Sequence, residues 1–489
     1  MTVGLRLDEA VWGLLHHALR LYRDNPRATA RLRQQLARLE QPLRVAIAGP
    51  WRSGKSTLLN AIMGEEVAPV DDADGADVFT WYEDGPQPRA IAYSTSHPPQ
   101  DLAMARSATG MRVDLVGWRA GELRDIVVRW PTRALRQMTL IDTPPITGVD
   151  AHGRAPVMDR ILRDADAVLY LTRDGRGSDL RVLESSRESA VGQAAPVNVI
   201  LVLSRADETG GGRIDALVTA RQLARRQFRD PRVDALCLNT VACSGLIGLA
   251  GRVLSESDFA ALAQLARVPR PALEAHLLSA DRFAGGELPV RLDAEVRAAL
   301  LDRLGIFGVR LATTLVRTGC DSRAKLSAEL IRRSGLTELR ESVNRLLIDR
   351  LDALKARSAM AAVEALLRAE PEPGTGELLA MLEQILAGAH EFRELRLLAA
   401  LRDNRLGFDT ELAAEARRLV GGDGVGLAAR LGVEHDATGQ RLWEVASDAQ
   451  WRWRRAAEDG TLRLAQRRGA QVVVRSCEGM LAELAAGGR

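Results

Sequence analysis

The sequence predicts an α/β domain with a central, mostly parallel sheet, joined to an all-α helical bundle that forms a neck or stalk. Between residues 43 and 203, short apolar runs alternate with helical stretches, which is the pattern of buried strands in a parallel sheet. Only 4% of the residues are aromatic, while Leu, Ala, Arg and Glu abound, so we expect far more helix than strand. At about 150 residues per domain, the 489 residues suggest two to four domains.

Five apolar runs mark the expected strands. They are Val45–Ala48, Ile126–Val128, Met138–Ile141, Ala167–Leu171 and Val197–Leu203. Residues 8–40 instead carry an apolar stripe at helical spacing, interrupted at Asn25 and Pro26, and we expect this stripe to face the core of a bundle. Residues 254–350 are mostly helical, and residues 377–489 read as three or four helices.

These patterns predict three parts of the chain. Residues 1–40 form an N-terminal helical segment that packs with the neck, residues 41–350 form the α/β domain, and residues 351–489 form the helical neck and stalk. We expect a hinge near residues 349–355 or 370–374.

Charge and cysteine content exclude several classes of protein. Lys+Arg is 67 and Asp+Glu is 64, and a formal charge of +3 argues against a dedicated nucleic-acid binder. The four cysteines show no CxxC spacing, so we expect no metal cluster and no disulfide framework, and a reducing cytosol fits. Residues 1–21 do not resemble a signal peptide, and no apolar run reaches the length of about 18 residues that predicts a membrane span.

The chain contains only three lysines among its 67 basic residues. One interpretation of the excess of arginine is a GC-rich genome, and a lysine kept under that pressure would be a better functional candidate than usual. Lys325 and Lys355 lie on expected helices, where we expect solvated charges. Lys55 differs because it lies in a phosphate-binding motif.

Residues Gly49–Ser56 match the pattern GxxxxGK[ST], between an expected strand and an expected helix. Glycines let this loop curl so that backbone amides face phosphate oxygens, and the N-terminus of the helix adds positive potential. Lys55 would reach the β- and γ-phosphates, and Ser56 would bind Mg²⁺. Further contacts to the nucleotide phosphates would come from Gly49, Ser53, Gly54 and Thr57.

Three motifs farther along the chain bear on the metal and the base. Asp142 ends an expected strand, where an aspartate can hold Mg²⁺ through water. In Ser204-Arg205-Ala206-Asp207, the aspartate can accept hydrogen bonds from the N1–H and 2-amino groups of guanine, which adenine lacks, and the arginine can stack on a purine. Ser244, in the segment 242–245, could bring backbone amides to the guanine O6. An ATP-driven motor is the alternative if the motif at 204–207 does not select guanine.

The order and spacing of these motifs resemble the dynamin superfamily of large GTPases, and bacterial dynamin-like proteins in particular. The resemblance covers nearly the whole chain, and it is carried by Gly54–Gly64, Ser204–Glu208, Gly212–Asp215, Leu304–Gly308 and Arg333–Leu336. It implies a GTPase domain on a helical neck and stalk, which binds GTP or GDP with Mg²⁺ and hydrolyses GTP. It also implies nucleotide-dependent pairing with itself or a related protein, and peripheral action at the inner face of a bacterial membrane.

The sequence departs from this family at the residues that sense the γ-phosphate. Family members carry Asp-x-x-Gly from the position of Asp142 onward, whereas this chain has Pro145 in place of the glycine and therefore lacks its N–H. Ala76 stands where a Mg²⁺-binding threonine is expected, and the nearest hydroxyl, on Thr80, should belong to a strand. Arg52 could supply an in-cis positive charge to hydrolysis or could be a surface arginine. We expect slow hydrolysis, and the alternative is a catalytically weak assembly subunit that pairs with a related GTPase.

Membrane contact has two candidate segments. Trp451 and Trp453 alternate with arginines, which suits a headgroup region, but their spacing places them on opposed faces of a helix, so we expect one in the core. The loop 421–427 could be an insertion tip. Because no apolar paddle is evident, attachment through a partner subunit is the alternative.

Overall fold

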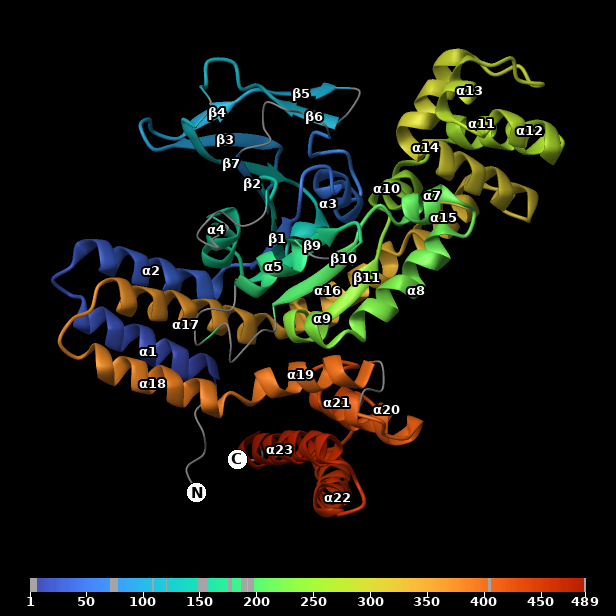
Figure 1. The fold of residues 1–489 in the computed structure, drawn as a ribbon. Coiled ribbons are helices and arrows are strands. Elements are labelled where there is room, and N and C mark those ends of the chain that lie inside the picture. Colours follow the sequence, from blue (N-terminus) through green and yellow to red (C-terminus); the bar gives the residue numbers. More distant parts are fainter. Residues whose placement is uncertain are drawn as a thin grey trace.

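The computed structural model describes residues 7–70, 78–107, 110–119, 121–147, 156–174, 178–185, 191, 198–402 and 406–487. Within these ranges, a central sheet is flanked by helices, a four-helix layer lies on one side of it, and further helices follow at the C-terminal end (Figure 1). The predicted combination of an α/β domain with an all-α bundle is confirmed. The limits of the three predicted parts remain a prediction.

The central sheet has nine strands in the described part of the chain, in the order β11-β10-β9-β1-β8-β2-β7-β3-β4. Strands β11, β10, β9, β1 and β8 run parallel to one another, and β2 pairs antiparallel with β8. The strands are β1 (Leu43–Ala48), β2 (Phe79–Asp84), β3 (Arg89–Ser94), β4 (Gln100–Leu102), β7 (Leu123–Trp130), β8 (Met138–Asp142), β9 (Ala167–Thr172), β10 (Val199–Leu203) and β11 (Asn239–Ala242). A separate hairpin consists of β5 (Met104–Ser107) and β6 (Gly110–Val113).

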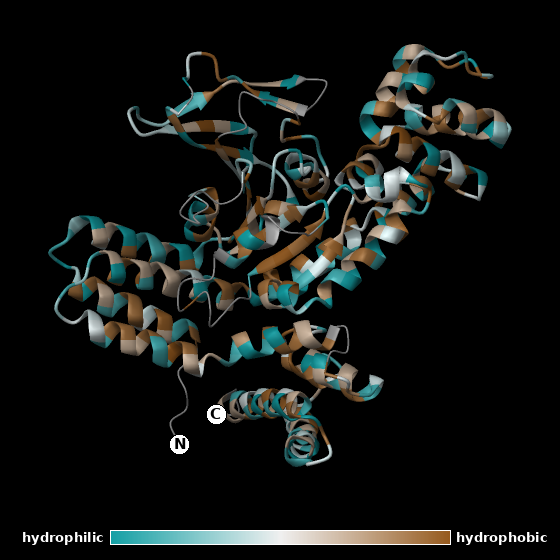
Figure 2. Ribbon diagram, in the orientation of Figure 1, coloured by the Kyte–Doolittle hydropathy of each residue, from teal (hydrophilic) through white to brown (hydrophobic). Residues whose placement is uncertain are grey.

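All five predicted runs fall on strands of the sheet, namely β1, β7, β8, β9 and β10, and most of their described residues are buried. Val197, the first residue of the last run, lies outside the described residues. Every residue of β9 and β10 is buried, and these strands lie in the most hydrophobic part of the ribbon (Figure 2). Thr80 lies on β2, as expected, directly opposite Asp142 in the register of the neighbouring strand. Ala76 lies outside the described residues.

The helices around the sheet are α3 (Lys55–Met63), α4 (Pro156–Asp164), α5 (Ser178–Ser185), α7 (Thr209–Gly212), α8 (Ala216–Phe228), α9 (Pro231–Leu236), α10 (Gly245–Val253), α11 (Glu256–Arg267), α12 (Arg270–His276), α13 (Ala280–Gly285), α14 (Ala294–Arg317), α15 (Arg323–Ser334) and α16 (Leu336–Leu346). Short 3₁₀ helices are η1 (Arg133–Leu135), η2 (Ala206–Glu208) and η3 (Ile348–Arg350). Helix α10 packs against both α3 and α15, so it connects the phosphate loop with the helices that precede the neck.

The four-helix layer consists of α1 (Leu7–Leu21), α2 (Pro26–Glu40), α17 (Leu351–Ala369) and α18 (Thr375–Gly388), which lie side by side (Figure 1). Asn25 caps α2 by accepting a hydrogen bond from the amide of Ala28, and Pro26 occupies its first turn, which explains the predicted interruption. The apolar stripe of the N-terminal helices faces the core, as expected: most of its residues are buried, and Leu19, Leu36 and Leu39 are partly buried against the same core. The segment before the sheet thus packs against helices that follow it by more than 300 residues.

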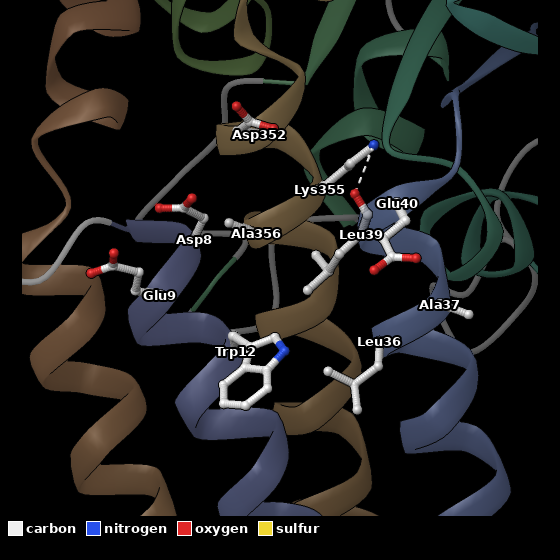
Figure 3. Close-up of a pocket in the computed structure, with 10 residues that line it drawn as sticks. All are labelled: Asp8, Glu9, Trp12, Leu36, Ala37, Leu39, Glu40, Asp352, Lys355 and Ala356. Atoms are coloured by element: carbon white, nitrogen blue, oxygen red, sulfur yellow. Dashed lines mark hydrogen bonds between the residues drawn. The ribbon is translucent and has the colours of Figure 1, made fainter.

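Lys355 does not carry a solvated charge, contrary to our expectation. The residue is only 7% exposed, and its Nζ donates a hydrogen bond to the carbonyl oxygen of Leu39, 3.0 Å away (Figure 3). The last carbonyls of a helix lack intrahelical partners and carry partial negative charge, so the end of α2 attracts this ammonium group. Burial lowers the pKa of Lys355. Lys325 is exposed as expected and pairs with Asp321.

Asp166, between α4 and β9, is a buried carboxylate where the sheet meets the neck. It accepts a hydrogen bond from Nη2 of Arg38 on α2 at 2.9 Å, and another from the backbone amide of Arg44 on β1 at 3.0 Å. Arg357 on α17 is also buried; burial lowers its pKa to about 10, although the charge of Asp166 raises it. Asp166 therefore joins β1, the first strand of the sheet, to α2 of the four-helix layer, which is the predicted neck.

The C-terminal part contains more helices than predicted. From residue 375 onward, the described residues form six helices rather than three or four: α18, α19 (His390–Arg402), α20 (Thr410–Leu419), α21 (Leu427–Leu431), α22 (Gly439–Glu458) and α23 (Leu464–Gly487). Helix α21 accounts for one of the additional helices, because its five residues are too few to show a helical period. Trp453 is 1% exposed and Trp451 is 61% exposed, so one tryptophan lies in the core, as expected.

Glu394 on α19 holds the C-terminal helices together. It accepts hydrogen bonds from Arg350 of η3 at 2.9 Å, from Arg430 at 2.5 Å and from the hydroxyl of Ser476 at 2.7 Å. Burial alone would raise the pKa of Glu394, but the hydrogen bond with His390 and the charges of the two arginines outweigh it and hold the pKa at about 2. No helix within the described ranges has the length and apolar character that crossing a bilayer requires.

Candidate nucleotide-binding site

The predicted site residues meet at one edge of the sheet. The phosphate loop follows β1, Asp142 ends β8, and the segments 204–207 and 242–245 follow β10 and β11. Because these strands are parallel, their carboxyl ends lie together, and this is the edge where open α/β sheets bind ligands. The structure therefore brings the four motifs to one side of the molecule.

The backbone of the phosphate loop has the shape that the glycines were expected to allow. Gly54 precedes α3 in the left-handed conformation, with φ 86° and ψ 29°. Gly49 has φ 151°, and an added Cβ there would lie 2.5 Å from the carbonyl oxygen of Leu171. Arg52 also has a positive φ, 55°, which is uncommon for a residue with a side chain. Its carbonyl oxygen accepts a hydrogen bond from Arg173, a neighbour that no motif indicated.

Lys55 is held at the loop by long hydrogen bonds to backbone carbonyls. Its Nζ lies 3.4 Å from the oxygen of Gly49 and 3.3 Å from that of Pro50. Burial lowers the pKa of Lys55, and the charge of Asp142 opposes this shift. The hydroxyl of Ser53 is buried and has no hydrogen-bond partner within the part of the chain that the structure describes. A lysine and a hydroxyl placed in this way suit phosphate oxygens.

Asp142 and Ser56 form the pair expected to bind Mg²⁺. The Ser56 hydroxyl donates to Oδ2 of Asp142 at 2.7 Å, while the buried Oδ1 has no partner among the described residues. Burial raises the pKa of Asp142, and the hydrogen bond from Ser56 and the charge of Lys55 oppose the shift. A buried carboxylate with an unpaired oxygen beside a serine hydroxyl fits a hard divalent cation.

The segment after Asp142 is fastened to the phosphate loop. The hydroxyl of Thr143 donates to the carbonyl oxygen of Ile47 at 3.0 Å, and the amide of Ile146 donates to the carbonyl oxygen of Gly49 at 3.0 Å. Pro145, between them, has no N–H. The first amide after the two prolines is thus already bonded to the loop, which motif matching did not anticipate.

The expected base-binding residues lie on two adjacent turns: the first is the segment 204–207 after β10, and the second is the segment 242–245 after β11. Ser204 donates its hydroxyl to the carbonyl oxygen of Thr172 at 3.1 Å, and Arg205, with φ 51°, pairs with Glu208 at 2.5 Å. Burial raises the pKa of Asp207, while a hydrogen bond with the Ser244 side chain lowers it. The carboxylate that would read guanine is therefore held between these turns.

The backbone amides of the second turn have other partners. The amide of Cys243 donates to the carbonyl oxygen of Leu203 at 2.9 Å, and the amide of Ser244 donates to that of Ser334 at 2.8 Å. These two amides are therefore not available to guanine O6 in this structure, and the expectation for the segment 242–245 as a whole stays a prediction. What Ser244 offers to the site is its side chain, beside Asp207.

A known protein matches this chain over nearly its whole length. The chain is 34% identical to the isoniazid-induced protein IniC from two strains of Mycobacterium tuberculosis over 491 residues, which is 98% of this chain and 99% of that protein. The profile described as the dynamin family matches residues 45–179, which hold the phosphate loop and Asp142. The chain belongs to the dynamin family.

Two solved structures are similar to this dynamin-family chain at low scores. One is described as an oligomerised bacterial dynamin pair, with a TM-score of 0.30 and 14% identity over 85% of this chain and 78% of that chain. The other is the G domain of the T. maritima FeoB iron transporter, with a TM-score of 0.21 and 15% identity over 42% of this chain and 89% of that chain. At these scores the superpositions add nothing to the functional argument.

Proposed function

We propose that this dynamin-family protein binds GTP and GDP with Mg²⁺ and hydrolyses GTP at the edge of the sheet. The observation that carries the proposal is the meeting of Lys55, Asp142 and Asp207 at the ends of parallel strands, with a buried Oδ1 that lacks a partner among the described residues. Calorimetry of GTP against ATP should give tighter binding of GTP. The preference should disappear in Asp207→Ala, and a preference that survives this substitution would exclude our account of base selection.

The remaining loop residues have proposed roles that follow from their position. Ser56 and Asp142 would hold Mg²⁺, the aspartate through water, and the bound ion would neutralise charge on the phosphates. Lys55 would bind the β- and γ-phosphates, and Arg52 would bring a second positive charge to the γ-phosphate. The positive φ of Arg52 supports this role, because strained backbone is concentrated at functional sites.

We infer that hydrolysis is slow without a partner. The γ-phosphate sensor of the family is a backbone amide, whereas Pro145 has none and the amide of Ile146 is bonded to Gly49. In Pro145→Gly, single-turnover hydrolysis should accelerate, and binding should favour GTP over GDP more than in the natural chain. Fast turnover of the natural chain that Pro145→Gly leaves unchanged would contradict this inference.

The hydrogen bond from the amide of Ile146 to Gly49 favours a second candidate function, a weakly catalytic subunit that pairs with a related dynamin-like protein. Single-turnover hydrolysis, with and without such a partner and liposomes, separates the two candidates. Turnover by the chain alone favours the enzyme, and turnover that requires the partner favours the subunit. For either candidate function, the proposed place of action is the inner face of a bacterial membrane. The proposed division of the chain is an N-terminal helical segment at residues 1–40, a GTPase domain at 41–350 and a helical neck and stalk at 351–489.

Trp451 is our proposed point of membrane contact. It is 61% exposed on α22, and the guanidinium of Arg455 lies 4.9 Å from its ring centroid, a combination that suits a headgroup region. Co-sedimentation with anionic vesicles should weaken in Trp451→Ala. It should be unchanged in the control Trp443→Ala, whose tryptophan is 45% exposed on the same helix. Equal binding by both variants and the natural chain would favour attachment through a partner.

A further inference from the structure

The turn between α15 and α16 lies directly behind the loop expected to hold the base. The carbonyl oxygen of Ser334 accepts the hydrogen bond from the amide of Ser244, 2.8 Å away. Gly335, the next residue, ends α15 and precedes α16 with φ 84° and ψ 0°. An added Cβ on Gly335 would lie only 2.0 Å from the carbonyl oxygen of Ala242. The turn therefore contacts both ends of the segment 242–244.

The turn is itself rigidly held. Ser334 is 1% exposed, its hydroxyl donates to the carbonyl oxygen of Ile331 at 2.7 Å, and it accepts from the amide of Leu336 at 3.2 Å. Arg221 on α8 donates to the carbonyl oxygens of Arg332 and Arg333 at 2.9 and 2.7 Å. This guanidinium satisfies two of the carbonyls that the end of a helix leaves without intrahelical partners.

The two base-binding turns depend on each other. The carbonyl oxygen of Cys243 accepts a hydrogen bond from the amide of Ala206 at 3.4 Å. The hydroxyl of Ser244, which accepts from the amide of Ile247, lies near enough to Asp207 to lower the pKa of that carboxylate. A displacement of the segment 242–244 would therefore move the partner of the carboxylate that reads guanine. Hydrogen-bond recognition is sensitive to such displacement, because donors and acceptors that are misaligned are left unpaired.

We infer that Ser334 and Gly335 are positioning residues for guanine recognition, and that they hold the segment 242–244 against Asp207. The inference rests on the proposed guanine-nucleotide function. The segment Arg333–Leu336 lies far along the chain from the other motifs, and folding brings it against the segment 242–244. Because α10 packs against both this turn and α3, the test must separate base recognition from phosphate binding, and the affinity for ADP reports the phosphate part.

The test is the ratio of affinities for GDP and ADP, measured on the full chain by displacement of a fluorescent nucleotide. Gly335→Ala should lower the GDP-over-ADP ratio at least tenfold, while the weak affinity for ADP stays unchanged. The matched control is Gly319→Ala. Gly319 has φ 120°, but its added Cβ meets no heavy atom of the described residues within 4 Å, so this variant should keep the natural ratio.

Arg221→Gln provides a second variant that does not add a Cβ to the turn. Loss of its hydrogen bonds to the carbonyl oxygens of Arg332 and Arg333 should lower the GDP-over-ADP ratio severalfold. If Gly335→Ala does not fold, the Arg221→Gln variant alone tests the inference. An unchanged ratio in Arg221→Gln and in folded Gly335→Ala would overturn the inference. A natural chain that does not prefer GDP to ADP would instead refute the proposed function, so the two failures are distinguishable.

Discussion

Replacing Asp166 by asparagine should destabilise the protein strongly at the junction of sheet and neck. The Asp166 side chain is 3% exposed and that of Arg38 is 6% exposed, so the pair is almost fully removed from water. Asparagine keeps the shape but removes the charge, which leaves Arg38 buried without its counter-ion. Breaking one partner of such a pair costs about 3–5 kcal/mol, because the remaining charge stays in a medium of low dielectric constant.

Urea unfolding of the full chain, followed by far-UV circular dichroism, measures this loss. The control is Asp101→Asn, which removes an ion pair of similar length, 2.6 Å to Arg89, but with side chains 62% and 54% exposed. The control should leave the midpoint unchanged, since solvent already screens that pair. If Asp166→Asn loses less than about 1 kcal/mol, the carboxylate does not hold the junction and our reasoning about buried charge is wrong.

Three further predictions test the core and the site. Trp453→Ala should lower the free energy of unfolding by about 3–5 kcal/mol, because it empties a buried site beside Phe408, whereas Trp451→Ala should change it by less than about 0.5 kcal/mol; urea midpoints check both. The pKa of Glu394 is depressed from 4.5 to about 2, so the stability it contributes is present above pH 4.5 and is lost as the pH falls toward 2; acid titration of Glu394→Gln should lack this loss. Gly49→Ala should weaken nucleotide binding at least tenfold in calorimetry, since its Cβ would lie 2.5 Å from a carbonyl oxygen, and natural affinity in a folded Gly49→Ala would contradict the loop geometry.

Continuous apolar runs made the central strands predictable. β9 and β10 are buried along their whole length, so each reads as strand from composition alone. β3 and β4 were not singled out, because their residues are partly exposed and belong to the sheet only through pairing with β7 and with each other. Pairing between distant segments leaves no local period in the sequence.

The arrangement of the candidate site was predictable where a motif determines it, but contacts between distant segments were not predictable. The phosphate loop and Asp142 lie together as the motifs require. The burial of Lys355 was not predicted, because helical spacing in the sequence does not reveal that the carbonyl oxygen of Leu39 on α2 lies beside its ammonium group. The bond from Ile146 to Gly49 and the bond from Ser244 to Ser334 depend likewise on residues that only the fold brings together.

Calorimetric titration of GDP into the full chain in the presence of Mg²⁺ tests the central claim most directly, with Lys55→Ala as the comparison. The account predicts saturable binding by the natural chain, and affinity about 100-fold weaker in the variant, because charge-assisted hydrogen bonds to phosphate are lost. Removal of Mg²⁺ by chelation should also weaken binding by the natural chain. Equal affinity of the natural chain and Lys55→Ala would contradict the claim that this edge of the sheet binds the nucleotide.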